Sequence, residues 1–358
     1  MNEPSVLIRR QGAAGLISLN RPRAIHALDL EMVEAMTAAL LGWVRDPGVA
    51  VVIIDHAPHA GGDPRLSRGF CAGGDIAMLR CSALEDGGAQ ARQFFFTEYR
   101  LNDLLYNYPR PVVSFMDGIT MGGGVGISQP ARYRVATANT RLAMPEAGIG
   151  LFPDVGAGWY LSRLSGRLGP FLALTGARLN GADCLWAGLA SHHLPVAAQA
   201  EAKARMIDGE APGRVLAALA EQPVDTPITA QLMDILRHFN KPTLEAIIAS
   251  LDSDEGAWAK NTRAMLATRC PTTCKVALRQ MAQSLRMESF SQNMAMEYRI
   301  ACRVVMLPDF AEGVRAVILD KDNAPRWNPA TPEAVTDEMI EAIFAPLPTQ
   351  EEWTPHEL

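Results

Sequence analysis

Apolar residues recur along the chain with two different periods, and the first half alternates between them. Residues 5–10 and 15–20 have the pattern of two short strands joined by a Gly/Ala turn. Residues 30–44 carry apolar side chains at helical spacing and predict a helix, for which Asp29 can serve as the N-cap. Residues 49–54 form an all-apolar run that is typical of a strand buried on both faces.

The same order of elements then recurs. Residues 90–107 have a helical pattern, and residues 111–116 have that of another buried strand, which a Gly-rich turn and a short helical stretch follow. Residues 132–136 and 141–143 predict further short strands. Strands that alternate with helices predict an α/β fold with parallel strands and right-handed crossovers.

The character of the chain changes near residue 197. From there to the end, helical patterns rich in Ala, Leu and Met are separated by Pro or Gly, and no convincing strand follows Leu194. We therefore expect an α/β core over residues 1–196 and a helical C-terminal region over residues 197–358, without a flexible linker between them.

Composition and charge exclude several function classes. The 358 residues are 48% hydrophobic, and the net charge of −6 gives no electrostatic footprint for nucleic acid, so an anionic substrate would need a local basic patch. No apolar run reaches membrane-spanning length, and the start lacks a signal or transit pattern, so we expect a cytoplasmic protein or the mature form of an organellar one. The six cysteines show no paired framework, and the CxxxC spacing of Cys270 and Cys274 fits neither a zinc site nor a redox motif.

Two Gly-rich turns can bring bare backbone N–H groups close to a ligand. They lie in GFCAGGDI (residues 69–76) and GITMGGGVG (residues 118–126). Neither the dinucleotide fingerprint nor the Walker pattern fits the second turn. Close packing of a helix on a strand is the competing interpretation of such glycines, and Asp75 can cap the helix after the first turn.

Acidic residues follow the second turn. Glu146 and Asp154 stand among apolar neighbours in MPEAGIGLFPDVG, and burial would raise their pKa and suit them to proton transfer. Taken alone, each is more often a capping or turn residue. Glu98, in FFFTEYRLN, lies on a predicted helix, and the pattern leaves open whether it faces solvent or a cleft. Amide donors beside a carboxylate pair are what cleavage of an activated acyl bond requires.

Several long motifs in this order resemble the crotonase (enoyl-CoA hydratase/isomerase) superfamily, and within it the 3-hydroxyisobutyryl-CoA hydrolases. The resemblance covers nearly the whole chain and implies a spiral of ββα units with parallel sheets, followed by a helical region that covers the active site. It rests on FCAGGDI, ITMGGGVGIS, MPEAGIGLFPDVGAGWYLSRL, LALTGARLNGADCLWAGLASH, MEYRIACRV and FAEGVRAVILDKDNAPRWNP.

The resemblance implies an acyl-CoA substrate whose thioester oxygen lies between the N–H groups of Gly74 and Gly123. In RPRAIHALD, Arg23 corresponds to a basic residue that faces the CoA phosphates, and Ala27 to backbone that contacts the adenine. Asp75 and Ile76 complete the implied CoA-binding set. CoA arrives as part of the substrate, and neither a metal nor a redox cofactor is implied.

The acidic positions separate the branches of the superfamily. Hydratases use a second glutamate that would fall at Gly126, and dienoyl-CoA isomerases also need an acidic residue there. Glu146, Asp154 and Glu98 match the hydrolase set, which implies cleavage of 3-hydroxyisobutyryl-CoA, or a close 3-hydroxyacyl-CoA, in valine breakdown. Glu146 then acts as nucleophile or general base, Asp154 orients the 3-hydroxyl or a water molecule, and Glu98 positions one of these groups.

Two other functions remain open at this point. One is an enoyl-CoA hydratase or isomerase that uses Glu146 alone, and the other is a non-catalytic homologue that serves as a structural subunit. The assembly is open as well: related hydratases form trimers, whereas the longer helical region of this chain would also suit a monomer or a smaller homo-oligomer.

Overall fold

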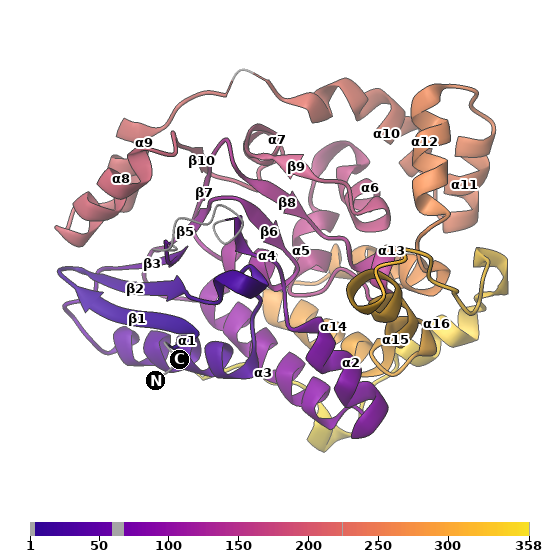
Figure 1. The fold of residues 1–358 in the computed structure, drawn as a ribbon, viewed down its shortest axis with the longest axis horizontal. Coiled ribbons are helices and arrows are strands. Elements are labelled where there is room, and N and C mark those ends of the chain that lie inside the picture. Colours follow the sequence, from indigo (N-terminus) through magenta and orange to yellow (C-terminus); the bar gives the residue numbers. More distant parts are fainter. Residues whose placement is uncertain (1–3, 59–67, 224, 358) are drawn as a thin grey trace.

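The strands of the computed structural model, which describes residues 4–58, 68–223 and 225–357, form two sheets (Figure 1). The larger sheet has six strands in the order β1-β2-β3-β5-β7-β10, and the smaller has four in the order β4-β6-β8-β9. The strands of the larger sheet are β1 (Val6–Gln11), β2 (Ala14–Leu19), β3 (Val51–His56), β5 (Val112–Met116), β7 (Tyr133–Ala136) and β10 (His192–His193). Those of the smaller sheet are β4 (Gly69–Cys71), β6 (Ile119–Met121), β8 (Arg141–Ala143) and β9 (Leu179–Asn180).

From β3 to β8, successive strands alternate between the two sheets. The antiparallel hairpin β1–β2 opens the larger sheet, and β3, β5, β7 and β10 then join it in parallel. In the smaller sheet β4, β6 and β8 run parallel, and β9 pairs antiparallel with β8. A strand in the larger sheet, a strand in the smaller sheet and one or two helices therefore make one turn of a spiral. The expected ββα spiral with parallel sheets is confirmed.

Helices follow each pair of strands. Asp29 accepts a hydrogen bond from the Met32 N–H and caps the first helix, as expected. The helices of residues 1–196 are α1 (Leu30–Val44), α2 (Ile76–Glu85), α3 (Ala89–Tyr106), α4 (Gly123–Ser128), α5 (Ala157–Ser162), α6 (Leu168–Thr175) and α7 (Gly181–Trp186).

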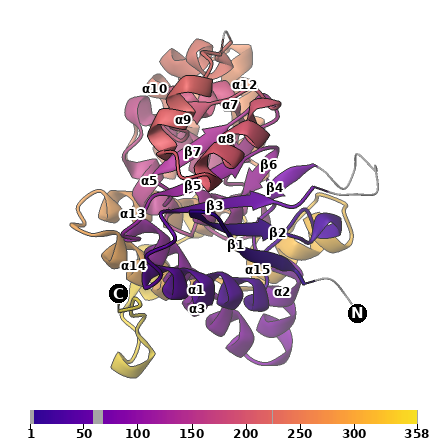
Figure 2. The same cartoon turned by 90° about the vertical axis from the view of Figure 1, so that its left-hand side faces the viewer.

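The inner strands β2, β3 and β5 of the larger sheet are largely buried on both faces, as the apolar run at residues 49–54 predicts for β3, whereas β1 at the edge is mostly exposed. Alternate residues of β3 point to opposite sides, so Val51 and Ile53 join one hydrophobic cluster while Val52 and Ile54 join another. Helices α8 (Ala198–Ile207) and α9 (Pro212–Leu219) cover the first side (Figure 2). Helices α1 and α3 contribute to the second cluster.

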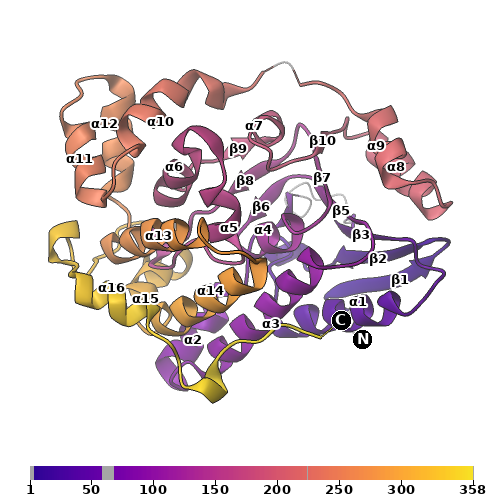
Figure 3. The ribbon, with the colours of Figure 1, turned by 180° about the vertical axis from the view of Figure 1, so that it is seen from behind.

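The C-terminal region is helical, and no strand follows β10 in the part of the chain that the structure describes. Its helices pack on the core, α13 against α5 and α6, and α14 against α3 (Figure 3). One hydrophobic cluster contains residues from both sides of residue 197. The two regions share a core, and the domain boundary at residue 197 therefore stays a prediction. The remaining helices are α10 (Leu232–Phe239), α11 (Leu244–Asp252), α12 (Ala257–Leu266), α13 (Pro271–Ser284), α14 (Phe290–Val304), α15 (Pro308–Val314) and α16 (Asp337–Phe344).

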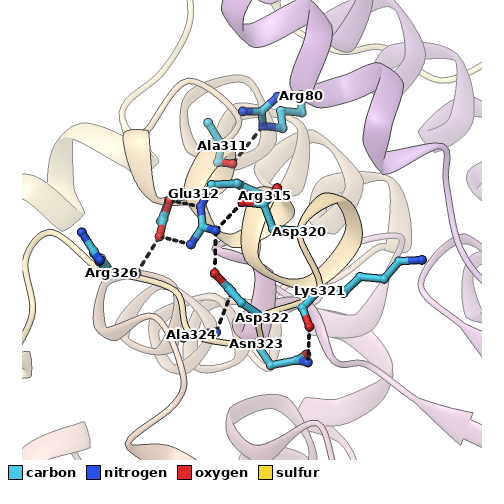
Figure 4. Close-up of polar contacts among 10 residues, drawn as sticks. All are labelled: Arg80, Ala311, Glu312, Arg315, Asp320, Lys321, Asp322, Asn323, Ala324 and Arg326. Atoms are coloured by element: carbon cyan, nitrogen blue, oxygen red, sulfur yellow. Dashed lines mark hydrogen bonds and ion pairs between the residues drawn. The ribbon is translucent and has the colours of Figure 1, made fainter.

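After α15 the chain makes a π-helical turn over Arg315–Leu319 and then reverses direction. The Arg315 guanidinium holds this reversal by donating two hydrogen bonds of 2.8 Å to Glu312 and bonds of 2.6 and 2.8 Å to Asp320 and Asp322 (Figure 4). A planar guanidinium suits this task because its five donors can serve several carboxylates at once. These bonds join residues 312–322 to one another and thereby fix the shape of the turn.

The short strands β4 and β6 were not predicted. The sequence predicts Gly-rich turns there, whereas the structure places a three-residue strand immediately before each turn. Three residues are too few to show a period of two, and these strands form because each pairs with its neighbour in the smaller sheet.

The two Gly-rich turns pack against each other without room for side chains. A Cβ placed on Gly124 would lie 2.8 Å from the Cβ of Cys71 and would also press on the Cys71 carbonyl. The start of α4 can therefore approach the end of β4 only because residue 124 is glycine.

We expect Gly124→Ala to lower the free energy of unfolding by roughly 1–3 kcal/mol, the usual cost of overpacking. Thermal or denaturant unfolding measures the change. The matched control is Gly42→Ala in α1, where an added Cβ meets nothing within 4 Å. This control should gain up to about 1 kcal/mol from helix propensity. Equal stability of the two variants would contradict the tight contact.

Candidate active site

A cavity of about 340 Å³ lies where the two Gly-rich turns meet α3 and the 3₁₀ helix η3 (Glu146–Ile149). Its wall includes Gly74, Gly123, Glu98, Glu146 and Asp154, so the structure brings together all five residues predicted for the reaction. The C-terminal region completes the wall with Arg269, Val317, Ile318 and Asn323.

Gly74 and Gly123 supply two backbone N–H groups to this cavity. The Leu28 N–H donates to the Gly73 carbonyl (2.7 Å) and the Leu28 carbonyl accepts from the Asp75 N–H (2.9 Å). This parallel bridge uses the groups on either side of Gly74, so the Gly74 N–H points the other way. Gly123 is the first residue of α4, where N–H groups lack an acceptor within the helix.

Neither N–H group has an acceptor among the residues that the structure describes. The two turns are also close to each other, since a Cβ built on Gly73 would lie 3.8 Å from the nitrogen of Gly123. Gly73 and Gly122 have φ values of +122° and +47°, a region that favours glycine. Two free donors on adjacent turns are the arrangement that stabilises an oxyanion.

Glu146 lies directly over the second turn. Pro145 precedes it at the start of η3, and its Oε1 would be 3.1 Å from a Cβ built on Gly122. The side chain is buried, and its Oε2 has no hydrogen-bond partner among the described residues. Burial raises the pKa of Glu146 well above its usual value, and the nearby charge of Asp154 raises it further.

Asp154 is held by a residue that the sequence did not single out. The buried Tyr99 hydroxyl donates a hydrogen bond of 2.7 Å to the Oδ2 of Asp154. Burial raises the pKa of Asp154 to about 6, while this hydrogen bond favours the ionised form and lowers it. The only sequence signal for Tyr99 is its place next to Glu98 in FFFTEYRLN.

Glu98 faces the cavity rather than solvent, which answers the question that its helical pattern left open. It is 2% exposed, and its Oε1, which has no partner among the described residues, would lie 2.6 Å from a Cβ built on Gly123. Burial and then the charge of Asp154 raise the pKa of Glu98 well above its usual value. Three carboxyls in one cavity oppose joint ionisation, and Asp154 is the one most readily ionised.

The residues predicted to bind CoA separate into two groups. Ile76 lines the cavity, whereas Arg23, on the exposed turn η1 (Pro22–Ala24), is not among the described residues that do. The other two predicted residues, Ala27 and Asp75, are linked through Arg21, which donates to the Ala27 carbonyl (2.7 Å) and to the Asp75 carboxylate (3.3 Å). Asp75 also caps α2 by accepting from the Met78 N–H, as predicted, so its side chain is already engaged within the protein.

Arg269 is the one cationic side chain among the described residues of the cavity wall, and the sequence did not indicate it. Its Nε and Nη2 donate to the Thr175 carbonyl at 3.1 and 2.6 Å. Its Nη1 would lie 2.6 Å from a Cβ built on Gly148, so only glycine fits there.

No side chain can enter the cavity from position 126. A Cβ built on Gly126 would lie 2.6 Å from the Cβ of Val155 and 3.0 Å from the Nδ2 of Asn102. Val155 and Asn102 therefore occupy the space that an acidic side chain at position 126 would need.

Neither a metal centre nor a membrane span is found among the described residues. No group of three His, Cys, Asp or Glu side chains in residues 4–58, 68–223 and 225–357 could hold a metal ion, although three acids line the cavity. Within the same ranges no helix is long and apolar enough to cross a bilayer.

Proteins with this sequence pattern and fold are known. The 3-hydroxyisobutyryl-CoA hydrolase, mitochondrial, of Gallus gallus is 38% identical over 352 residues, which are 96% of this chain and 89% of the relative. A crystal structure of a carnitinyl-CoA dehydratase from Mycobacterium thermoresistibile is 39% identical, with a TM-score of 0.91 over 98% of this chain and 99% of its own. A crystal structure of an enoyl-CoA hydratase from Rhodobacter sphaeroides is 36% identical, with a TM-score of 0.89 over 98% of this chain and 100% of its own.

A family model described as enoyl-CoA hydratase/isomerase matches residues 14–344. The match spans the two Gly-rich turns, the acidic residues and most of the helical region. The chain therefore belongs to the enoyl-CoA hydratase/isomerase family, the crotonase superfamily that its motifs resemble.

Proposed function

We propose that this protein hydrolyses the thioester of 3-hydroxyisobutyryl-CoA, or of a close 3-hydroxyacyl-CoA, to free CoA and the hydroxy acid in valine catabolism. The observation that carries the proposal is the pair of free N–H groups at Gly74 and Gly123 beside the buried Glu146. The full-length hydrolase relative supports the same reaction.

The reaction begins with the thioester oxygen between the two N–H groups. As the carbonyl carbon becomes tetrahedral, its oxygen gains negative charge, and preorganised donors in a site with little water stabilise that charge strongly. Removal of one such donor typically costs a factor of about 10²–10³ in rate.

Glu146 has two routes open to it. As general base, it takes a proton from water, the resulting hydroxide adds to the carbonyl carbon, and the C–S bond breaks when the tetrahedral intermediate collapses. As nucleophile, its carboxylate adds to the same carbon, expels CoA thiolate and leaves a mixed anhydride, which water then hydrolyses. The raised pKa makes the ionised Glu146 a stronger base in the first route.

We assign Asp154 the task of orienting the 3-hydroxyl or the water and of helping to deliver a proton to the departing thiolate. A carboxyl whose pKa is about 6 can both hold and release a proton near neutrality. Glu98 would position the hydroxyl or Glu146 from α3. Arg23, Ala27, Asp75 and Ile76 stay proposed CoA-binding residues.

Hydration of an enoyl-CoA is the competing reaction, and the two solved relatives are named as a carnitinyl-CoA dehydratase and an enoyl-CoA hydratase. Hydration in this superfamily calls for a second glutamate at position 126, and Val155 and Asn102 fill that space here. A non-catalytic subunit would not need the three acids, which all line the cavity. Hydrolysis therefore fits the site best.

Cofactor, assembly and location stay predictions. The proposed steps use only side chains, backbone N–H groups and water, with CoA as part of the substrate. We expect a monomer or a small homo-oligomer, which light scattering can determine. The sequence predicts a cytoplasmic protein or the mature form of an organellar one, and the Gallus gallus relative is named mitochondrial.

The proposed reaction is tested by thiol release from a panel of 3-hydroxyacyl-CoA esters, beside hydration of crotonyl-CoA. Thiol release should dominate, and Glu146→Gln or Asp154→Asn should lower kcat/KM about 10²–10⁴-fold, the usual worth of a general acid or base. The matched control is Asp103→Asn, a buried acid on α3 that Ser291 binds outside the cavity. It should stay within about twofold of the wild type, as expected for a residue without contact to the transition state. Crotonyl-CoA hydration without thiol release would refute the proposal.

The two routes for Glu146 differ in where an oxygen atom from solvent ends. In a single turnover in ¹⁸O-water, mass spectrometry of the protein should find label in Glu146 if the residue is the nucleophile. If Glu146 is the general base, the label enters the hydroxy acid and the protein stays unlabelled.

The dependence of rate on pH tests the role of Asp154. If turnover needs ionised Asp154, kcat/KM should fall as the pH drops below about 6, because the raised pKa protonates it there. Tyr99→Phe removes a donor to the ionised form, so this acid limb should move to higher pH by about one unit, the equivalent of one net hydrogen bond. Tyr108→Phe is the matched control, because its buried hydroxyl donates to the Leu40 carbonyl instead. An unmoved limb in Tyr99→Phe would exclude Asp154 as its source.

A further inference from the structure

A fourth buried carboxylate, Glu297, lies outside the cavity on α14. Its side chain is fully buried, and no described lysine or arginine forms an ion pair with it. It belongs to the motif MEYRIACRV, to which the sequence assigned no role. A buried carboxylate without a cation requires several hydrogen-bond donors.

Four donors surround Glu297. The backbone N–H groups of Gly156 and Gly158 donate at 2.7 and 3.0 Å. The amides of Gln280 and Asn293 donate at 2.8 and 2.9 Å. Burial raises the pKa of Glu297 to about 7, and the four donors oppose this rise because they favour the ionised carboxylate, which is only an acceptor.

The two backbone donors follow Asp154 closely, since Gly156 is the N-cap of α5 and Gly158 lies in its first turn. Gln280 binds the chain just before Asp154 by donating to the Pro153 carbonyl at 2.8 Å. Residues 153–158 are thus bound on both sides of Asp154 by α13 and α14 of the C-terminal region. A Cβ on Gly158 would come within 2.9 Å of the Oε1 of Glu297, so the contact depends on glycine.

The turn needs such support because its backbone is strained. Val155 has a φ of +51°, which is costly for a β-branched residue, and Gly156 follows with a φ of +91°. A strained residue of this kind costs about 1–3 kcal/mol and persists only where its surroundings over-determine it. The bonds to Glu297 hold the turn immediately after Asp154, and Tyr99 holds the Asp154 side chain itself.

We propose that Glu297 is a positioning residue for Asp154, acting through the N–H groups of Gly156 and Gly158 to keep the Asp154 carboxylate against Tyr99 and in the cavity. The role in turnover rests on the proposed function, because it needs Asp154 to act in the reaction. The C-terminal region thereby contributes to the chemistry as well as to the wall of the cavity.

Glu297→Gln tests the proposal in the whole protein, because glutamine keeps the shape but replaces one acceptor oxygen by a donor. We expect kcat for the 3-hydroxyacyl-CoA to fall about 10- to 100-fold, as for a small misplacement of a reacting group, with KM within about threefold. Gln280→Met, which frees the Pro153 carbonyl, should show the same fall in kcat and serves if Glu297→Gln does not fold. Its acid limb of kcat/KM should also move to higher pH, as Asp154 loses its bond from Tyr99. In Glu297→Gln the loss of a neighbouring negative charge opposes this shift, so Gln280→Met is the variant in which the limb is measured.

The matched control is Ser284→Ala. The buried Ser284 hydroxyl donates to the Oδ1 of Asn293 at 2.6 Å, so the change disturbs the same polar cluster without touching residues 153–158. It should lower the melting temperature while kcat stays within about twofold of the wild type, since it acts on stability alone. Loss of stability without loss of kcat in Glu297→Gln and Gln280→Met would overturn the proposal.

A second measurement separates this inference from the proposed function. In protein labelled with ¹³C at aspartate carboxyls, the Asp154 signal, assigned with Asp154→Asn, reports its titration without substrate. We expect its midpoint to rise in Gln280→Met, which keeps the Glu297 carboxyl in place, and to stay unchanged in Ser284→Ala. A wild type without thiol release would refute the hydrolase proposal while this titration still decides the positioning role, and an unchanged midpoint in Gln280→Met would overturn it.

Discussion

Close contact between the end of β4 and the start of α4 determines the geometry of the cavity. The Cys71 backbone and Gly124 meet where no Cβ fits, and this contact brings the Gly74 and Gly123 N–H groups to the same space. Because β4 and β6 pair in the smaller sheet, each turn leaves its strand at the same edge. The free N–H groups are thus backbone features of two adjacent turns, and their placement depends on packing rather than on any one side chain.

The acids of the cavity come from two different parts of the chain and are buried at a cost. Burial raises the pKa of Glu98 and Glu146, so ionising them in the folded protein is harder than in water. The Tyr99 hydroxyl offsets part of this cost at Asp154, the one of the three whose carboxyl accepts a side-chain hydrogen bond among the described residues. Environment therefore distinguishes three chemically similar carboxyls, and it leaves Asp154 the most acidic of them.

Much of the fold could be predicted from the sequence, because its long elements have clear periods. The helices at 30–44 and 90–107, the buried strand at 49–54 and the helical end of the chain are present within a few residues of the expected bounds. The three-residue strands β4 and β6 could not be predicted, because tertiary pairing forms them. In the site, Glu146 and the two glycines stand in distinctive motifs. Tyr99, Arg269 and Glu297 matter through contacts that only the folded chain shows, since each partner is 55 or more positions away.

The filled space at Gly126 also has an evolutionary meaning. A glutamate introduced there would collide with Val155, whose left-handed backbone belongs to the turn that holds Asp154. A second acid at this position therefore requires Val155 to move, and Val155 lies in the segment that Glu297 and Gln280 hold. A change of residue 126 would thus call for compensating changes in residues 153–158 and in their C-terminal supports, which lie far apart in the sequence.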